Sequence, residues 1–299
     1  MRRFWFLFMI CLFLALGTSM ASSSEDKLSF PDHPIDDFDT FVKVYDSRRC
    51  AECHAEIYEE WQESFHARSM VSSIKGIANF FSVGVPKEWE KKLNKQEIIK
   101  CLDCHLPQIK FASERLAREI AGYMIEAKMA KGAQKQRAIS KLKQLNISCY
   151  GCHNIKIAGT APGITGHIDP NVIYTAGEGE SEAHETEENP ILKRSFFCIQ
   201  CHGVYIAPDG ESTYCNTLSG SYVHNYLGQG GRESCQDCHM KKNNRGHRFP
   251  GGHDLEIVKE GLLLQAEAKA FRYGIGKWVP AVNVEAFITN KAGHRTPDG

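Results

Sequence analysis

Ten cysteines of this 299-residue chain fall into five copies of the pattern C-x-x-C-H. Two thiols about one helical turn apart can form thioether bonds to the two vinyl groups of one porphyrin, and the next residue can then bind the iron. We therefore expect five covalently attached haem c groups. The attaching cysteines would be Cys50, Cys53, Cys101, Cys104, Cys149, Cys152, Cys198, Cys201, Cys235 and Cys238, and the proximal iron ligands His54, His105, His153, His202 and His239.

Zinc ions and disulfide bonds are the alternative uses of paired cysteines. A zinc ion usually takes four protein ligands, from two cysteine pairs or from one cysteine pair and a distant histidine pair. Disulfide frameworks stabilise small scaffolds and do not call for a histidine after every second cysteine. The adjacent histidine in all five copies therefore favours haem. Cys215 lies outside the pattern, and we expect it to be a partly buried free thiol.

Each haem iron needs a second ligand, most often another histidine, if it is to carry electrons without binding a substrate. The histidines outside the motifs outnumber the five haems, which favours irons that mostly carry two histidines. His66, for example, lies on a predicted helix, residues 55–70, on which Ile57, Trp61 and Phe65 recur at helical spacing. The candidate distal ligands are His66, His184, His247, His253, His294, His167 and His224, with His33 as the weakest.

The segments around the motifs predict short helices joined by loops rich in glycine, proline and asparagine. The clearest helical pattern runs through residues 111–145, where Leu116, Ile120 and Met124 share one apolar face and Gly132 interrupts the helix. Residues 266–274 and 279–290 predict two β-strands around a turn. We expect a mainly α fold with long loops, organised around five c-type haems, and a short C-terminal β segment.

The chain divides into three predicted regions. Residues 1–21 resemble a secretory signal peptide, with two arginines, a short apolar run and small residues before a cleavage site after Ala21. Residues 22–258 would form the pentahaem domain and residues 259–299 the β-rich segment. The two strands there lack evident partners, so they dock on the haem domain or on another molecule, or the chain is the front portion of a longer protein; we favour the last.

Charge and hydropathy limit the partners. Lysine plus arginine equal aspartate plus glutamate at 36 each, which gives no electrostatic reason to expect a nucleic acid. No segment of the mature chain is apolar enough to span a membrane. Cleavage of the signal peptide would make this a periplasmic or extracellular protein. Redox proteins would act as electron donor and acceptor, and assembly into a homo-oligomer or filament stays open.

The stretch CAECHAEIYEEWQESFHARSM, residues 50–70, resembles the opening haem motif of multihaem cytochromes c related to the tetrahaem electron acceptor of hydroxylamine oxidoreductase. Residues 180–202 and 235–256 are similar to later segments of that family, as is the run from Phe287 to the end of the chain. The resemblance implies a distal role for His184, which its acidic surroundings alone do not suggest. The chain departs from the family in having five motifs and in Asp298, where threonine is usual.

We weigh two functions. The first is a secreted pentahaem cytochrome that passes electrons between respiratory partners through closely packed, mostly bis-histidine haems, without catalysis of its own. The second is a reductase or oxidase of small nitrogen or sulfur compounds, with one open haem iron and cations such as Arg245 and Arg248 steering an anion. The first predicts only low-spin haems, whereas the second predicts at least one ligand-accessible iron.

Overall fold

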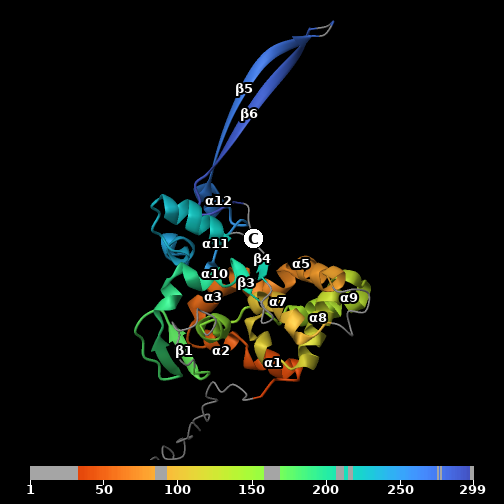
Figure 1. Ribbon diagram of the computed structural model, residues 1–299, viewed down its shortest axis with the longest axis vertical. Coiled ribbons are helices and arrows are strands. Elements are labelled where there is room, and N and C mark those ends of the chain that lie inside the picture. Colours follow the sequence, from red (N-terminus) through yellow and green to blue (C-terminus); the bar gives the residue numbers. More distant parts are fainter. Residues whose placement is uncertain are drawn as a thin grey trace, which may run out of the picture.

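The computed structural model describes residues 33–84, 93–157, 169–206, 212–214, 218–274, 276 and 278–296. It confirms a mainly α-helical fold with an antiparallel strand pair near the C-terminus (Figure 1). The predicted signal peptide, His167 and Cys215 lie outside the described residues. No helix in the described ranges is both long and apolar enough to cross a membrane.

The N-terminal half is a layer of helices joined by tight turns. Its α-helices are α1 (Phe38–Val44), α2 (Arg48–Ala51), α3 (Ala55–Glu63), α4 (Ser69–Ser72), α5 (Ile74–Asn79), α7 (Lys95–His105), α8 (Glu114–Met129) and α9 (Gly132–Leu142). Shorter 3-10 or π turns are η1 (His66–Arg68), η2 (Phe80–Gly84), η3 (Pro107–Phe111) and η4 (Gly151–Ile155).

The second half alternates short strands with short helical turns. The strands β1 (Val172–Thr175) and β2 (Glu185–Glu188) pair in parallel, and β3 (Val204–Ile206) pairs antiparallel with β4 (Ser212–Tyr214). The helical elements are η5 (Pro190–Lys193), α10 (Ser195–Ile199), α11 (Leu218–Ser221), η6 (Tyr222–Tyr226), η7 (Leu227–Gln229), η8 (Asp237–Lys241), η9 (Lys242–Asn244), η10 (Gly246–Arg248) and α12 (Leu255–Gly261).

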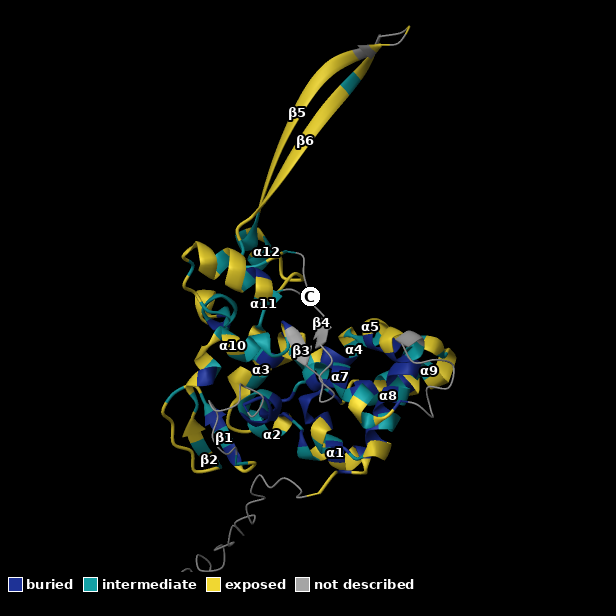
Figure 2. Cartoon of the chain, in the orientation of Figure 1, coloured by how far each residue is buried: buried dark blue, intermediate teal, exposed yellow. Residues whose placement is uncertain are grey.

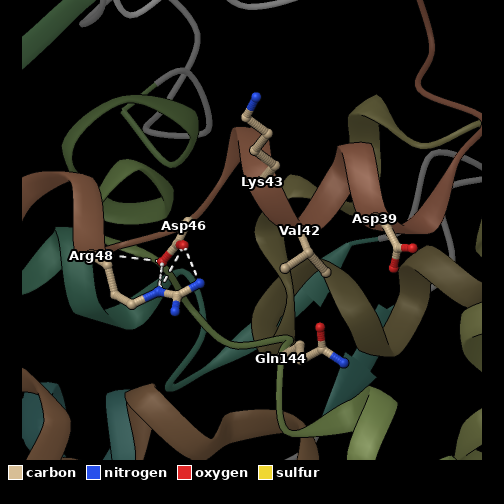
Figure 3. Close-up of a pocket in the computed structure, with 6 residues that line it drawn as sticks. All are labelled: Asp39, Val42, Lys43, Asp46, Arg48 and Gln144. Atoms are coloured by element: carbon tan, nitrogen blue, oxygen red, sulfur yellow. Dashed lines mark hydrogen bonds and ion pairs between the residues drawn. The ribbon is translucent and has the colours of Figure 1, made fainter.

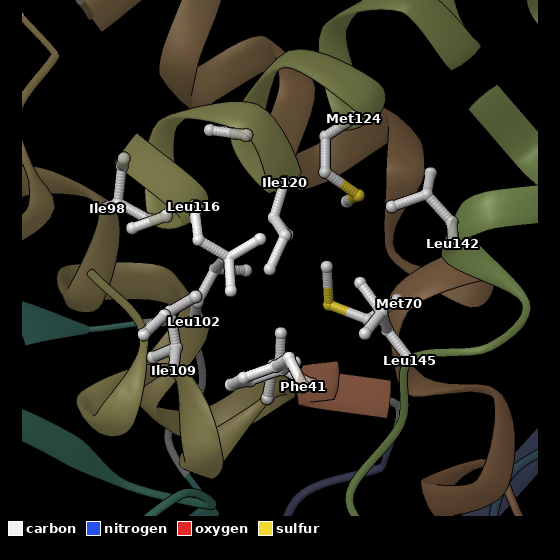
Figure 4. Close-up of a cluster of buried hydrophobic side chains, with 14 of the residues drawn as sticks. Phe41, Met70, Ile98, Leu102, Ile109, Leu116, Ile120, Met124, Leu142 and Leu145 are labelled. Carbon is white, nitrogen blue, oxygen red and sulfur yellow. The ribbon is translucent and has the colours of Figure 1, made fainter. Parts of the chain in front are cut away.

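One apolar core joins the helices of the first half (Figure 4). The helix predicted from residues 111–145 forms in two parts, because α8 ends before Gly132, whose φ of +57° suits a glycine, and α9 begins there. Ser113 caps α8 by accepting a hydrogen bond from the Leu116 amide at 3.1 Å. The fully buried side chains include Phe41, Met70, Ile98, Leu102, Ile109, Leu116, Ile120, Met124 and Leu142.

The C-terminal strands β5 (Leu262–Gly274) and β6 (Trp278–Asn290) form a long hairpin that projects from the body (Figure 1). Its register pairs Leu264 with Ile288 and Ala268 with Val284, so one face is almost entirely apolar. That face is exposed, and Ile288 keeps 71% of its surface accessible (Figure 2). Among the described strands, β5 and β6 hydrogen bond only to each other, and an isolated two-stranded hairpin is marginally stable in water.

Candidate haem-binding site

The motifs lie on single helical turns that gather each motif's cysteines and histidine. The His54 amide donates to the Cys50 carbonyl at 2.8 Å, and the His202 amide donates to the Cys198 carbonyl at 3.0 Å. Residues three and four apart on such a turn share one face. Both cysteines of a motif can therefore bond to one porphyrin while its histidine binds the iron of the same haem. The ten motif cysteines are free thiols.

Four of the five motif histidines face a second histidine from a distant part of the chain. The ring centres are 6.5 Å apart for His54 and His184, and 6.2 Å apart for His66 and His202. The other two pairs are His153 with His247 at 6.3 Å and His239 with His294 at 6.2 Å.

The ring spacing tests whether these residues fit a haem iron. A metal–imidazole bond of about 2 Å, plus about 1.1 Å from the ring nitrogen to the ring centre, would place the centres of two imidazoles about 6.2 Å apart on opposite sides of one ion. All four observed spacings agree with this value. The residues present therefore fit bis-histidine haem irons.

Several of these rings are oriented by hydrogen bonds at Nδ1. His153 Nδ1 lies 2.8 Å from the Tyr174 carbonyl, and His239 Nδ1 lies 2.8 Å from the Pro250 carbonyl. His294 Nδ1 lies 2.8 Å from the Arg295 carbonyl. A carbonyl oxygen only accepts, so Nδ1 carries the proton and Nε2 keeps its lone pair for a metal.

Burial favours the neutral form of the imidazoles, which is the form that binds metals. It lowers the pKa of His66 to about 3, and it also lowers the pKa of His153, His202 and His247. These rings therefore carry a free lone pair at neutral pH.

The turn that carries His247 is tied to the first motif's helix. The Glu60 carboxylate on α3 accepts a hydrogen bond from the His247 amide at 2.9 Å and pairs with Arg248 at 2.7 Å. Gly246 has a φ of +55°, and a Cβ there would come within 1.9 Å of Glu60. Only glycine permits this approach.

Phe249 is a site residue that the sequence analysis missed. Its ring centre lies 4.8 Å from that of His66 and 5.6 Å from that of His247, so one aromatic side chain contacts two of the facing histidines. Its φ of +44° is unusual for a bulky residue, and more so before Pro250. The sequence feature that could have indicated Phe249 is the rigid stretch HRFPGGH, residues 247–253.

His105, at the end of α7, differs from the other four proximal histidines. Its Nδ1 lies 2.9 Å from Ser73 Oγ, and its carbonyl accepts a hydrogen bond from Ser69 Oγ at 2.6 Å. Within the described ranges, no second imidazole faces its ring at the spacing of the other four pairs.

The remaining candidate ligands lie elsewhere. His253 is exposed and stacks on Phe65 with ring centres 4.7 Å apart, and His224 is exposed on η6. His33 is also exposed. The position of His167 lies outside the described residues, so its distal role stays a prediction.

Thiols of different motifs lie within hydrogen-bonding reach of one another. Cys50 contacts Cys149, Cys104 contacts Cys201, and Cys198 contacts Cys235. The first motif therefore adjoins the third, the second adjoins the fourth, and the fourth adjoins the fifth.

A buried ion cluster lies beside the second motif. Asp103 Oδ2 accepts a hydrogen bond from Lys156 Nζ at 2.9 Å, and Asp103 Oδ1 forms an ion pair with Lys110 Nζ at 3.0 Å. Burial alone would lower the pKa of Lys156, but the negative charges of Cys201 and Asp103 raise it above its usual range.

A surface cavity of about 240 Å³ lies apart from the motif side chains (Figure 3). Its lining includes Asp39 and Lys43 on α1, together with Asp46 and Arg48, which pair at 2.6 Å. None of the motif cysteines or histidines lines it. It therefore plays no part in the haem site.

Comparison with known proteins supports the same chemistry. Residues 49–119, which contain the first two motifs and His66, match the family model of cytochrome c554 and c-prime. No curated protein and no solved structure matches the chain. The matched segment is thus similar to a c-type cytochrome, and the match supports haem c binding, redox partners and a role in electron transfer.

Proposed function

We propose that the protein is a secreted pentahaem cytochrome c that carries electrons between two redox proteins. The observation that carries this proposal is the set of four histidine pairs at 6.2–6.5 Å. A bound haem c supplies one-electron exchange at its iron. An iron with two histidine ligands has no position for a substrate, so it transfers electrons.

The facing pairs support one distal ligand for each of four haems. His184 would complete the first motif's haem, His247 the third, His66 the fourth and His294 the fifth. The ten motif cysteines would form the thioether bonds, as their spacing predicts.

The contacts between thiols support a continuous electron path. Porphyrins attached at adjoining motifs would lie edge to edge, because their attachment points touch. The path would lead from the first motif to the third and from the fourth to either the second or the fifth. Cys152 acts electrostatically on Cys198, which joins the third motif to the fourth.

The location and the partners follow from the sequence. Cleavage after Ala21 would release a periplasmic or extracellular protein. The donor and the acceptor would be redox proteins, and self-assembly into an oligomer or filament would extend the same path.

His105 supports a second candidate, a reductase or oxidase of small nitrogen or sulfur compounds at the second haem. Its ring faces no described histidine, so either His167 completes that iron or the iron binds small molecules. The arginines expected to steer an anion are engaged elsewhere: Arg245 pairs with Glu260 at 2.6 Å, and Arg248 pairs with Glu60 and Glu63. Electron transfer therefore remains the better-supported function.

The haem content tests the proposal. Protein expressed with a cytochrome c maturation system should contain five haems per chain, measured as pyridine haemochrome against protein mass. A value of four or fewer, or release of haem by acidified acetone, would contradict covalent attachment at all five motifs. Substituting Cys235 and Cys238 by alanine should lower the count by one and serves as the calibration.

A further inference from the structure

Two charged side chains are buried together where the second, third and fourth motifs meet, and a third, exposed one pairs with them. Lys156 and Asp103 expose only 7% and 5% of their side chains, and Lys110 exposes 38%. The Asp103 carboxylate bridges both ammonium groups, at 2.9 Å and 3.0 Å. We call these residues the lysine triad.

The lysine triad lies against haem-attachment residues. Asp103 is the residue immediately before Cys104, and Lys156 follows His153 by one helical turn. The Lys156 ammonium acts electrostatically on Cys104, Cys152 and Cys201, and Lys110 also acts on Cys201. The triad is therefore close to thioether positions of three motifs.

A purely structural role accounts poorly for this arrangement. Buried ion pairs add little stability relative to apolar side chains of the same volume, because desolvation offsets the attraction. Two cations share one anion here, so the cluster carries a net charge of about +1, with Lys156 and Asp103 away from water and Lys110 at the surface. Salt screens the buried Lys156 charge less than it screens an exposed one.

We propose that the lysine triad raises the reduction potential of the haems attached at the second and fourth motifs. Reduction adds one electron to the iron, and a fixed positive charge nearby stabilises the reduced form. These two haems would then act as the electron-accepting end of the path. This inference rests on the proposed function, because it requires haems at Cys101–His105 and Cys198–His202.

Three variants change the charge of the triad in opposite directions. Lys156→Met lowers its net charge to 0, Asp103→Asn raises it to +2, and the double variant K156M/D103N restores +1. Redox titrations at pH 7, followed by optical and EPR spectra, would give the midpoint potential of each haem. Lys193→Met is the matched control, since Lys193 pairs with Glu188 at 3.1 Å on the surface.

We expect Lys156→Met to make reduction of two haems about tenfold less favourable, a shift of about −59 mV for one electron. Asp103→Asn should shift the same two haems upward, the double variant should return them towards the wild-type values, and Lys193→Met should shift none. Low-spin spectra that stay unchanged would show that ligation is intact.

Unshifted potentials in Lys156→Met would overturn the inference, as would shifts of the same sign in Lys156→Met and Asp103→Asn. If Asp103→Asn does not fold, Lys156→Met and the double variant still decide the question. Failure of the proposed function would be visible separately, as a haem count below five in the wild-type protein.

Discussion

His54, His153, His202 and His239 each face a second imidazole, whereas His105 lies against two serines. All five follow the same C-x-x-C-H pattern, so the motif alone does not determine the second iron ligand. Each facing histidine comes from a segment that the topology brings in from elsewhere: the β1–β2 loop, η1, η10 or the end of the hairpin. The coordination of each haem is therefore a property of the tertiary structure.

The largest expected effect is the loss of a facing ligand. His66→Ala should convert one low-spin haem, that of the fourth motif, to a high-spin form that binds cyanide or carbon monoxide. The optical and EPR spectra of the oxidised protein would show the change. His253→Ala is the matched control, since this nearby exposed histidine faces no motif histidine; a spin change there would show that the facing pairs do not identify the ligands.

The second prediction concerns His105, the motif histidine that faces no imidazole among the described residues. Nitrite, hydroxylamine or cyanide added to the wild-type protein should perturb at most one haem of five. If His167 completes the iron at His105, His167→Ala will create one new high-spin haem; if not, the wild-type protein already contains one. Perturbation of two or more haems would show that the four facing pairs do not close their irons.

Substituting Phe249 should change the surroundings of two haems at once and should lower the stability of the protein modestly. Phe249→Ala removes ring contacts with His66 and His247, each worth about 0.5–1.5 kcal/mol. We expect the free energy of unfolding to fall by about 1–2 kcal/mol and the EPR g-values of two haems to shift. Chemical denaturation and EPR would measure both, and Phe80→Ala is a control on an exposed phenylalanine. A change confined to one haem would contradict the shared contact.

The smallest expected effect is that of substituting Trp61. This residue links the helix after the first motif to the segment just before the third motif. Its indole donates to the Ile147 carbonyl at 3.1 Å. Trp61→Phe removes this donor and should lower the free energy of unfolding by about 1 kcal/mol, with all haem spectra unchanged. Denaturant titration would measure it, and a spectral change would mean that Trp61 contributes directly to a haem site.

Local patterns were sufficient to predict the elements with strong periodicity. Leu116, Ile120 and Met124 recur at helical spacing and are fully buried on α8, and the alternating residues of β5 and β6 form the expected hairpin. The parallel pair β1–β2 was not predicted, because four-residue strands carry little periodic signal and β2 consists mostly of glutamate. The helix expected through His66 ends at Glu63, where Ser64 becomes extended and a 3-10 turn begins.

The sequence alone did not predict which distant histidine faces which motif histidine. His184 lies in an acidic loop whose composition gives no reason to expect a ligand, and only the family resemblance indicated it. His253 shares the turn HRFPGGH with His247, yet it stacks on Phe65 at the surface. Such differences depend on how distant segments pack, and that information is not local to either histidine.

The most direct test of the four facing pairs is a quantitative EPR spectrum of the oxidised protein loaded with five haems. The pairs predict at least four low-spin haems per chain, with no more than one high-spin haem. Two or more high-spin haems in the wild-type protein would contradict the assignment of His66, His184, His247 and His294 as iron ligands.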